Sequence, residues 1–331
     1  MTDLATDDAV VAAATAGDEH AFATLARRHR RELHVHCYRM LGSYEDAEDL
    51  VQETLVRAWR AREGFVGSGF RAWLYRIATN ACLDAIRQKK RQVSRLDSFA
   101  EVPWLQPYPD RLLDLAAPPA AEPDSMLVAR ETIELAFLAA IQLLPAQQRA
   151  ILILREVLDW SAKEAAELLD TTVAAVNSAL QRARATLRDR LPDRDAHRPE
   201  SGPTEVERGL LDRYIDAHQR ADPSALTELV RDDIRITMPP QPLCYDGIPS
   251  LAPLLERAFG GSHGDWLLVP TSANRQLAAA NYLRAPGEDT FRAFKLDVLR
   301  FAGDRIVEVT TFDNTLFDAF GLPPTMAERP A

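Results

Sequence analysis

The spacing of apolar positions divides the 331-residue chain into a helical part and a later part of mixed pattern. Over residues 7–92, apolar side chains recur at steps of three and four, which predicts amphipathic helices. The same period returns over residues 126–191. Beyond residue 205, two predicted helices are followed by a strand, a third helix and four β-rich runs. This order is typical of an α+β domain with a mostly antiparallel sheet.

Two stretches interrupt these patterns and predict linkers. Prolines gather between residues 93 and 125, and a second stretch before residue 205 is charged and contains proline and glycine. We therefore expect a multidomain protein with two all-α domains and one α+β domain. The expected boundaries are 7–92, a linker at 93–125, 126–192, a linker at 193–204, and 205–325.

Charge is unevenly distributed along the chain. The 39 basic and 49 acidic residues give a net charge of −10, which on its own argues against a nucleic-acid partner. Residues 71–95, however, contain seven basic residues and one acid, and residues 181–190 contain four arginines and one acid. Clustered basic charge favours phosphate contact, although a solvated helix face is the ordinary alternative. Charge alone leaves nucleic-acid binding open.

Cysteine usage and the N-terminus bear on location. The three cysteines lie far apart without a CxxC pair, which predicts neither a disulfide framework nor a cysteine-based zinc site. The N-terminus is acidic, unlike a signal peptide, and no apolar run reaches the roughly 18 residues that span a bilayer. We expect a soluble, cytoplasmic protein without a membrane partner.

A metal site must be considered where histidines crowd one predicted helix. His29 and His36 could share a face, but His34 points elsewhere and no carboxylate completes a ligand set with Cys37. We expect no metal and no cofactor.

Residues 161–187 have the pattern of a helix-turn-helix. Ser161 and Glu164 form a capping box, and a three-residue turn separates the short first helix from a longer second one. An αα-hairpin within a bundle is the plain alternative. The second helix should bury one apolar face: Val173, Val176, Leu180, Ala183 and Leu187. Its polar face should present Thr172, Ala174, Asn177, Ser178 and Gln181 to a major groove, with Arg182 and Arg184 near phosphates.

Two features mark the first helical domain. Asp46, Asp49 and Glu53 form an acidic stripe after a Ser43 cap, which favours either helix stabilisation or docking on a basic partner. Further on, aromatic and basic side chains alternate in one helix and its preceding loop, as suits stacking on unpaired bases. The alternative is that most of its apolar side chains are core, namely Phe70, Trp73, Leu74 and Ile77.

Four runs together carry a family likeness: CYRMLGSYEDAEDLVQETLVRAWR, GFRAWLYRIATNACLDAIRQKKRQ, LPAQQRAILILREVLDWSAKEAAELL and AVNSALQRAR. In this order they resemble the extracytoplasmic-function group of bacterial sigma factors, of the sigma-seventy class. The resemblance implies a non-enzymatic initiation subunit that binds RNA polymerase core and promoter DNA. It implies that the polymerase clamp helices contact Asp46, Asp49, Leu50, Gln52, Glu53 and Trp59. It implies that the −10 element is bound by Phe70, Arg71, Trp73, Arg76, Asn80, Arg87, Lys89, Lys90 and Arg91.

The helix from Thr172 to Arg188 would, by the same resemblance, read the −35 element. The chain departs from the family at Asn177 and Ala179, where basic residues are common, and at Asp170, where glycine is common. Base specificity therefore does not transfer from the family to this chain.

Residues 205–322 are similar to the SnoaL-like cone fold, an extension found in one subtype of this family. The likeness implies a regulatory domain that modulates the sigma factor, with a small-molecule ligand as one option. Some cone-fold relatives are enzymes that use a buried acid, and the polar candidates for such a role in this chain are Asp246, His263, Arg292, Asp313 and Asn314. No His-Asp pairing at fixed spacing supports them, and we expect no catalysis.

Two other functions remain as alternatives. One is a ligand-responsive helix-turn-helix regulator without sigma activity, which would bind duplex DNA alone and dimerise. The other is an enzyme whose helical part only targets it.

Overall fold

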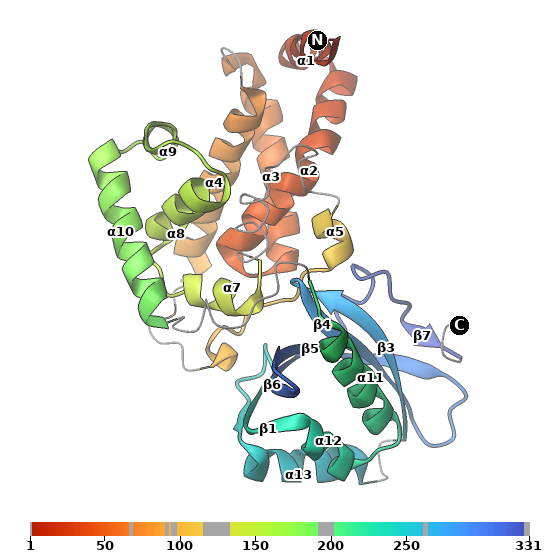
Figure 1. The fold of residues 1–331 in the computed structure, drawn as a ribbon. Coiled ribbons are helices and arrows are strands. Elements are labelled where there is room, and N and C mark those ends of the chain that lie inside the picture. Colours follow the sequence, from red (N-terminus) through yellow and green to blue (C-terminus); the bar gives the residue numbers. More distant parts are fainter. Residues whose placement is uncertain are drawn as a thin grey trace. The chain divides into compact units, whose positions relative to one another are not determined.

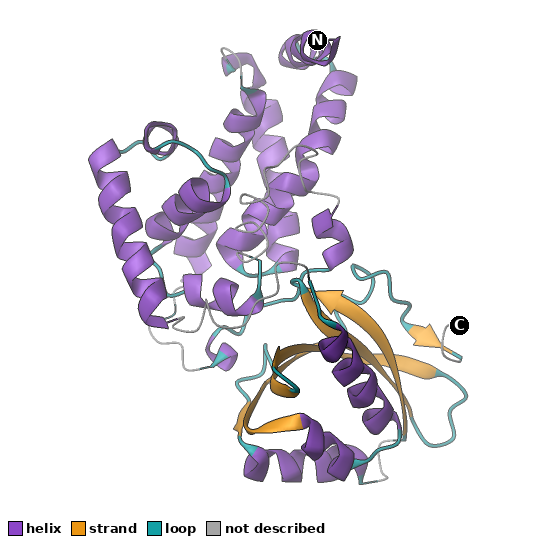
Figure 2. Cartoon of the chain, viewed as in Figure 1, coloured by secondary structure: helices purple, strands orange, loops and turns teal. Residues whose placement is uncertain are grey.

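The computed structural model describes residues 2–65, 69–89, 93, 98–114, 133–190, 202–260 and 264–327. They form two compact units. The first comprises the described residues within 1–94, 112–132 and 136–192, and the second those within 95–111, 133–135 and 193–331. Among the described residues, every strand belongs to the second unit (Figure 2). The expected fold class, helical domains followed by an α+β domain, is confirmed.

The first unit is built from helices (Figure 1). Its N-terminal helices are α1 Thr2–Thr15, α2 Glu19–Leu41, α3 Tyr44–Ala61, the 3-10 turn η1 Arg62–Gly64 and α4 Phe70–Lys89. Helices α2, α3 and α4 pack against one another. Further along lie α7 Leu135–Ile141, α8 Ala146–Leu152, the π-helical turn η3 Ile153–Val157, α9 Ala162–Leu168 and α10 Val173–Arg190. Between these two sets of helices in the sequence come the 3-10 turn η2 Phe99–Glu101 and the short helix α5 Asp110–Asp114. Residues 98–111 belong to the second unit.

Two of the helix starts expected from sequence are confirmed. The Ser43 hydroxyl accepts the backbone N–H of Asp46 at 3.3 Å and begins α3. Ser161 and Glu164 bond reciprocally at the start of α9, at 2.7 and 3.1 Å. These side chains satisfy N–H groups that the first turn leaves without helical partners.

A buried guanidinium joins α8 to α2. Arg149 has no exposed surface, and its Nη1 donates to the carbonyl of Met40 at 2.7 Å and to Gln142 Oε1 at 2.6 Å. Its Nη2 donates to the carbonyls of Gln142 and Leu144, at 3.1 and 3.3 Å. The side chain therefore bonds to a carbonyl at the end of α2 and to carbonyls of the turn between α7 and α8.

Replacing Arg149 by methionine should strongly destabilise the first unit. Methionine fills a similar volume but cannot donate to the carbonyls and the Gln142 side chain that Arg149 bonds. We therefore expect a loss of about 3 kcal/mol or more in the free energy of unfolding. Urea unfolding followed by far-UV circular dichroism measures the loss. The matched control is Arg188→Met on the exposed side of α10, which should leave the midpoint nearly unchanged. Equal midpoints for both variants would contradict this assignment.

The second unit is a curved sheet covered by three helices (Figure 1). The strands are β1 Val230–Thr237, β2 Cys244–Asp246, β3 Asp265–Ala273, β4 Gln276–Arg284, β5 Phe291–Ala302, β6 Arg305–Asp313 and β7 Thr325–Met326. Their order is β2-β1-β6-β5-β4-β3, with β7 on β5 and only the β1–β6 pairing parallel. The helices are α11 Glu205–Gln219, α12 Pro223–Leu229 and α13 Ile248–Phe259. Helix α11 packs on β3 and β4, and α13 packs on β1 and β2.

Residues 98–111, which the sequence assigns to a linker, pack with the second unit. Val102, Leu105 and Tyr108 are each at most 2% exposed. Apolar side chains within this proline-rich stretch are thus core residues, which explains why the chain here is ordered without long helices.

The β3–β4 turn holds this stretch through one side chain. Asn274 and Arg275 both have positive φ, 55° and 61°, and close a two-residue hairpin. The Asn274 carboxamide accepts the N–H of Tyr108 at 2.8 Å and donates to the carbonyl of Ile133 at 2.6 Å. Its own backbone N–H donates to the Tyr108 carbonyl at 2.9 Å, and that of Arg275 to Asp110 Oδ1 at 2.8 Å. A single buried carboxamide therefore ties together two segments that flank residues 115–132 in the sequence. We refer to these contacts as the Asn274 clamp.

Candidate nucleic-acid interface

Helix α10 separates a buried face from an exposed polar face. Val176, Leu180, Ala183 and Leu187 are buried as expected, but Val173 is 44% exposed, so the apolar face begins one turn later than the sequence pattern indicates. Thr172 caps the helix by accepting the N–H of Ala175 at 3.1 Å. The residues expected in the groove or near phosphates are all exposed: Thr172, Ala174, Asn177, Ser178, Gln181, Arg182 and Arg184.

The short helix α9 supports this arrangement. Ala165 and Ala166 are buried, so small side chains permit its contact with α10. Arg184 is held by Glu156 of η3, with Nε 3.0 Å from Oε1. One of the two expected phosphate-contacting arginines is therefore already paired with an acid of its own unit.

The aromatic residues of α4 divide between core and surface. Phe70 is 5% exposed and lies against Phe22, Phe65 and Trp73, with ring centroids 6.5, 5.6 and 5.4 Å away. Trp73 is half-buried against Phe65. The core alternative thus describes Phe70 and Leu74, which are both buried, whereas Trp73 and Ile77 are half-buried and Trp73 retains an accessible part for stacking.

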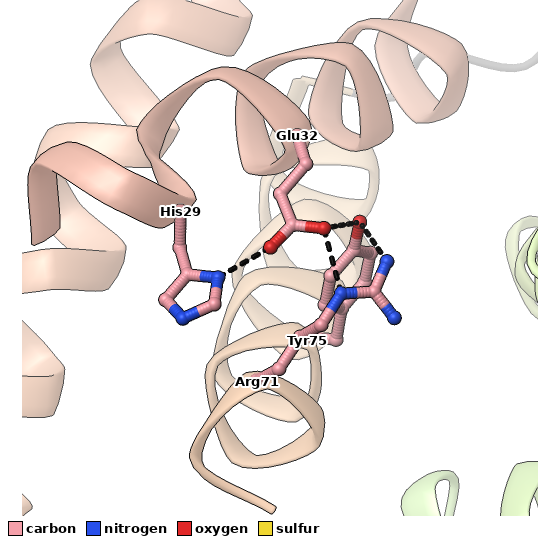
Figure 3. Close-up of polar contacts among 4 residues, drawn as sticks. All are labelled: His29, Glu32, Arg71 and Tyr75. Carbon is pink, nitrogen blue, oxygen red and sulfur yellow. Dashed lines mark hydrogen bonds and ion pairs between the residues drawn. The ribbon is translucent and has the colours of Figure 1, made fainter. Parts of the chain in front are cut away.

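Arg71 belongs to a polar cluster at the start of α4 (Figure 3). Its Nε donates to Glu32 Oε2 of α2 at 2.7 Å, and its guanidinium lies 4.8 Å from the centre of the Tyr75 ring. Tyr75 donates to the same Glu32 oxygen at 3.2 Å, while His29 contacts the other oxygen. Burial alone would raise the pKa of Glu32, but His29 and Arg71 hold it below its ordinary value. Arg71 is thereby fixed on α2 instead of projecting freely from α4.

The remaining polar positions of α4 lie on its exposed side. Asn80 and Arg87 are exposed, and Arg87 donates to Asp84 at 2.9 Å. Lys89 donates to Asp46 at 2.6 Å, which joins a residue expected to bind DNA to one expected to bind polymerase. Lys90 and Arg91 lie outside the described residues.

Arg76 and Tyr75 bring α4 against the helix-turn-helix. Arg76 Nη2 donates to the carbonyl of Glu167 in α9 at 2.5 Å. The Tyr75 ring lies 5.9 Å from that of Trp160, just before α9. A cleft between these elements is lined by Arg76, Lys163, Glu167, Asp170 and others. In this arrangement part of the basic face of α4 is occupied by the chain itself.

The acidic stripe on α3 is accessible. Asp49, Gln52 and Glu53 are exposed, and Val56 beside them is 48% exposed. Leu50 is buried, and Trp59 is half-buried against Phe22 at 5.1 Å between ring centroids. Val56 was missed from the sequence, where it reads as one more apolar helix position. An apolar side chain bordered by acids suits a partner helix that is apolar and basic.

Two of the crowded histidines of α2, His34 and His36, lie in the core. His36 Nε2 lies 2.9 Å from Thr79 Oγ1, and His34 Nε2 lies 3.6 Å from a Glu48 oxygen. Burial lowers the pKa of His36 to about 3 and that of His34 to about 4. Within the described part of the chain, no three His, Cys, Asp or Glu residues are grouped as metal ligands.

These histidines make stability depend on pH. Because their folded pKa values lie below that of a free histidine, about 6.5, the unfolded chain takes up protons that the folded chain does not as the pH falls from 6.5 towards 4. The stabilisation is complete above pH 6.5 and decreases through this window. We expect the urea midpoint to be lower at pH 5 than at pH 7.

The double variant His36→Phe, Thr79→Val removes one histidine and its hydrogen-bond partner together. It should reduce the difference between the two midpoints. An unchanged difference would contradict the buried neutral state of His36.

The polar candidates of the second unit that the structure describes lie on the surface. Asp246, Arg292, Asp313 and Asn314 are all exposed, and His263 lies outside the described residues. The buried acid is Asp297 of β5, with no exposed surface. It was missed, although it occupies an inward position of the β-rich run over residues 291–301.

No helix in the described ranges combines the length and the apolar character needed to cross a bilayer.

Comparisons with known proteins agree with this arrangement. Sigma-70 region 2 matches residues 25–92, and Sigma-70 region 4 matches residues 134–187. The chain is 42% identical over 321 residues to the ECF RNA polymerase sigma factor SigG of Mycobacterium tuberculosis, covering 92% of this chain and 85% of the relative. It is similar in fold to the crystal structure of the M. tuberculosis extracytoplasmic function sigma factor SigJ, with a TM-score of 0.57 and 22% identity, covering 89% of this chain and 97% of that one. The second unit is similar to an NTF-2 like protein from Burkholderia xenovorans, with a TM-score of 0.29 and 15% identity over 33% of this chain and 84% of that one.

Proposed function

This chain belongs to the extracytoplasmic-function RNA polymerase sigma factors, and we propose that it directs polymerase core to its promoters through α3, α4 and α10 while its C-terminal unit modulates that activity. The observation that carries the proposal is α10, whose exposed polar face opposes an apolar face that is packed from Val176 onward, after a capped turn. This is the geometry of a recognition helix, which enters the major groove with its N-terminal residues. We propose that the chain itself catalyses no reaction.

Reading of the −35 element would fall to the first half of α10. Asn177 and Gln181 are exposed and can each form paired hydrogen bonds with adenine. Ser178 and Thr172 can bond to several bases, and Ala174 can contact a thymine methyl group. Arg182 and Arg184 would contact phosphates and fix the register of the helix.

Binding of the −10 element would fall to α4. Trp73 is half-exposed beside the loop that precedes the helix, and Arg76, Asn80, Arg87 and Lys89 extend along the same helix. An aromatic surface next to backbone-neutralising cations suits an unpaired strand. Arg71, held by Glu32, would position this surface, and Phe70 would support it from the core.

Docking on the polymerase clamp helices would use α3. Asp49, Gln52 and Glu53 supply polar and acidic contacts and Val56 an apolar one. Asp46, paired with Lys89, and the packed Leu50 and Trp59 would shape this surface.

We propose that the C-terminal unit acts through the Asn274 clamp. The segments that it ties, at Tyr108 and Ile133, belong to the connection between the −10-binding and −35-binding domains. Promoter binding requires these domains to reach two separate DNA elements, so fixing the connection restrains initiation. The alternative of a ligand-responsive regulator without sigma activity is not favoured, because the chain carries both sigma regions.

Asn177→Ala should weaken recognition of one −35 position. Loss of a paired contact with a base costs about 1–3 kcal/mol of discrimination. The measurement is binding of the reconstituted holoenzyme to promoters that differ singly in the −35 element. Arg184→Ala is the control: it should weaken all of these promoters alike and reduce the salt slope by less than the full value of a solvated arginine, because Arg184 is already paired with Glu156. Unchanged discrimination by Asn177→Ala would contradict the assignment.

Asn274→Gly should raise transcription by the full-length chain. Glycine keeps the positive φ of the turn but removes both side-chain hydrogen bonds, each worth roughly 1 kcal/mol, so the restraint could weaken by up to about thirtyfold. Run-off transcription with polymerase core measures this.

Asn274→Asp is the second variant for the clamp. The carboxylate still accepts from Tyr108, but its other oxygen is buried against the Ile133 carbonyl and repels it, so the variant should give an increase at least as large as that of Asn274→Gly. Wild-type activity for both variants would overturn the clamp proposal and leave the sigma activity itself untouched.

A further inference from the structure

Two cysteine side chains meet in the core of the helical unit. Cys37 of α2 and Cys82 of α4 have no exposed surface, whereas Cys244 of the second unit is exposed. The thiols of Cys37 and Cys82 share a hydrogen bond. Neither thiol has a part in the polymerase and DNA contacts proposed above. The pair is therefore a reactive group that the proposed function leaves unused.

The packing of α2 on α4 holds these cysteines together. Arg71 Nε of α4 donates to Glu32 Oε2 of α2 at 2.7 Å, and further along both helices His36 Nε2 lies 2.9 Å from Thr79 Oγ1. The cysteines follow directly, one residue after His36 and three residues after Thr79. The two helices are thus fixed side by side up to the turn that carries the thiols.

The surroundings of Cys82 allow the close approach that a disulfide needs. Ala78 and Ala81 of α4 are buried, and their small side chains let neighbouring helices pack near the α4 backbone. A disulfide forms without strain only where the two Cα atoms can come within about 7 Å of each other. Thiols that already share a hydrogen bond across two packed helices meet this requirement with little movement.

Oxidation of this pair by a hydroperoxide balances without any other reactant. One thiolate attacks a peroxide oxygen, the O–O bond breaks, and a sulfenic acid and the first water result. The second thiolate then attacks the sulfenic sulfur, the S–O bond breaks, the second water leaves and the S–S bond forms. The two sulfur atoms lose two electrons, which the peroxide gains.

Burial controls the rate of this reaction. Burial and the hydrogen bond to Cys37 raise the pKa of Cys82, while Arg149 of α8 acts in the opposite direction. Arg149 also bonds the carbonyl of Met40, close to Cys37 in α2, and α8 packs on α4. Local opening of α8 would admit peroxide, and the nearby guanidinium favours the thiolate that reacts. We expect slower oxidation here than at the exposed Cys244.

We propose that Cys37 and Cys82 are an oxidisable dithiol, which hydroperoxides convert into a reversible disulfide that cross-links α2 to α4. The cross-link restricts the unfolded chain and so stabilises the helical unit. It follows from the packing of the core and does not depend on the promoter function proposed above.

The test uses the full chain carrying Cys244→Ser, which prevents exposed thiols from linking two molecules. After treatment with hydrogen peroxide, free thiols are alkylated and tryptic peptides are analysed by mass spectrometry. We expect peptide Glu32–Arg39 to be linked to peptide Ile77–Arg87, and dithiothreitol to separate them. Sulfinic or sulfonic acids at both cysteines in place of the link would overturn the proposal. So would thiols that stay reduced for about a hundred times longer than Cys244 of the wild-type chain needs to react.

Cys82→Ala and Cys37→Ala, each added to Cys244→Ser, are the matched variants. Peroxide should raise the urea midpoint of the Cys244→Ser chain by roughly 1 M, because the disulfide closes a long loop. Each alanine variant should have the same midpoint before and after peroxide, so a lower starting stability does not affect the comparison. An unchanged midpoint in the oxidised Cys244→Ser chain, or an equal rise in the alanine variants, would contradict the cross-link.

Discussion

The buried guanidinium of Arg149 is the contact on which the helical unit depends. With a single rigid group it donates to the carbonyl of Met40 in α2 and to the carbonyls of Gln142 and Leu144, which lie between α7 and α8. Only arginine offers so many donors in a fixed plane, and burying them is favourable only while every acceptor stays in place. In the same unit α4 lies beside α9, where Arg76 donates to the Glu167 carbonyl. The helices proposed to contact DNA and polymerase therefore belong to one compact unit.

In the second unit, a buried polar side chain, that of Asn274, likewise bonds to two backbone segments, at Tyr108 and Ile133. Asn274 reaches two separate segments because the left-handed turn projects its carboxamide beyond the sheet. Asparagine tolerates this backbone conformation better than most residues, and its amide both donates and accepts. Turn conformation and recognition of the connecting segments are therefore properties of the same residue.

Local sequence patterns predicted the main helices and strands of this structure but not its long-range contacts. Spacing and turn chemistry predict the caps at Ser43 and Ser161 and the two faces of α10. They also predict the succession of helices and strands along the chain. Val173 was expected to be buried but is exposed, because the helical period does not show where the contact with a neighbouring helix ends. The packing of residues 98–111 depends on partners more than 100 residues away, which proline content cannot reveal. The inward position of Asp297 was readable from alternation, but its four donors come from four separate segments of sequence.

The pairing of basic with acidic side chains inside the helical unit would affect how DNA binding depends on ionic strength. Arg87, Lys89 and Arg184 each already contact a carboxylate of their own unit. If these side chains contact phosphates as proposed, a phosphate would replace that carboxylate, and the freed acid would attract a cation from solution, which offsets the counterion that DNA releases. The entropy gained for each such contact would be smaller than for a solvated lysine or arginine. An acidic protein with this arrangement would have low nonspecific affinity, and its DNA contacts would be comparatively insensitive to salt.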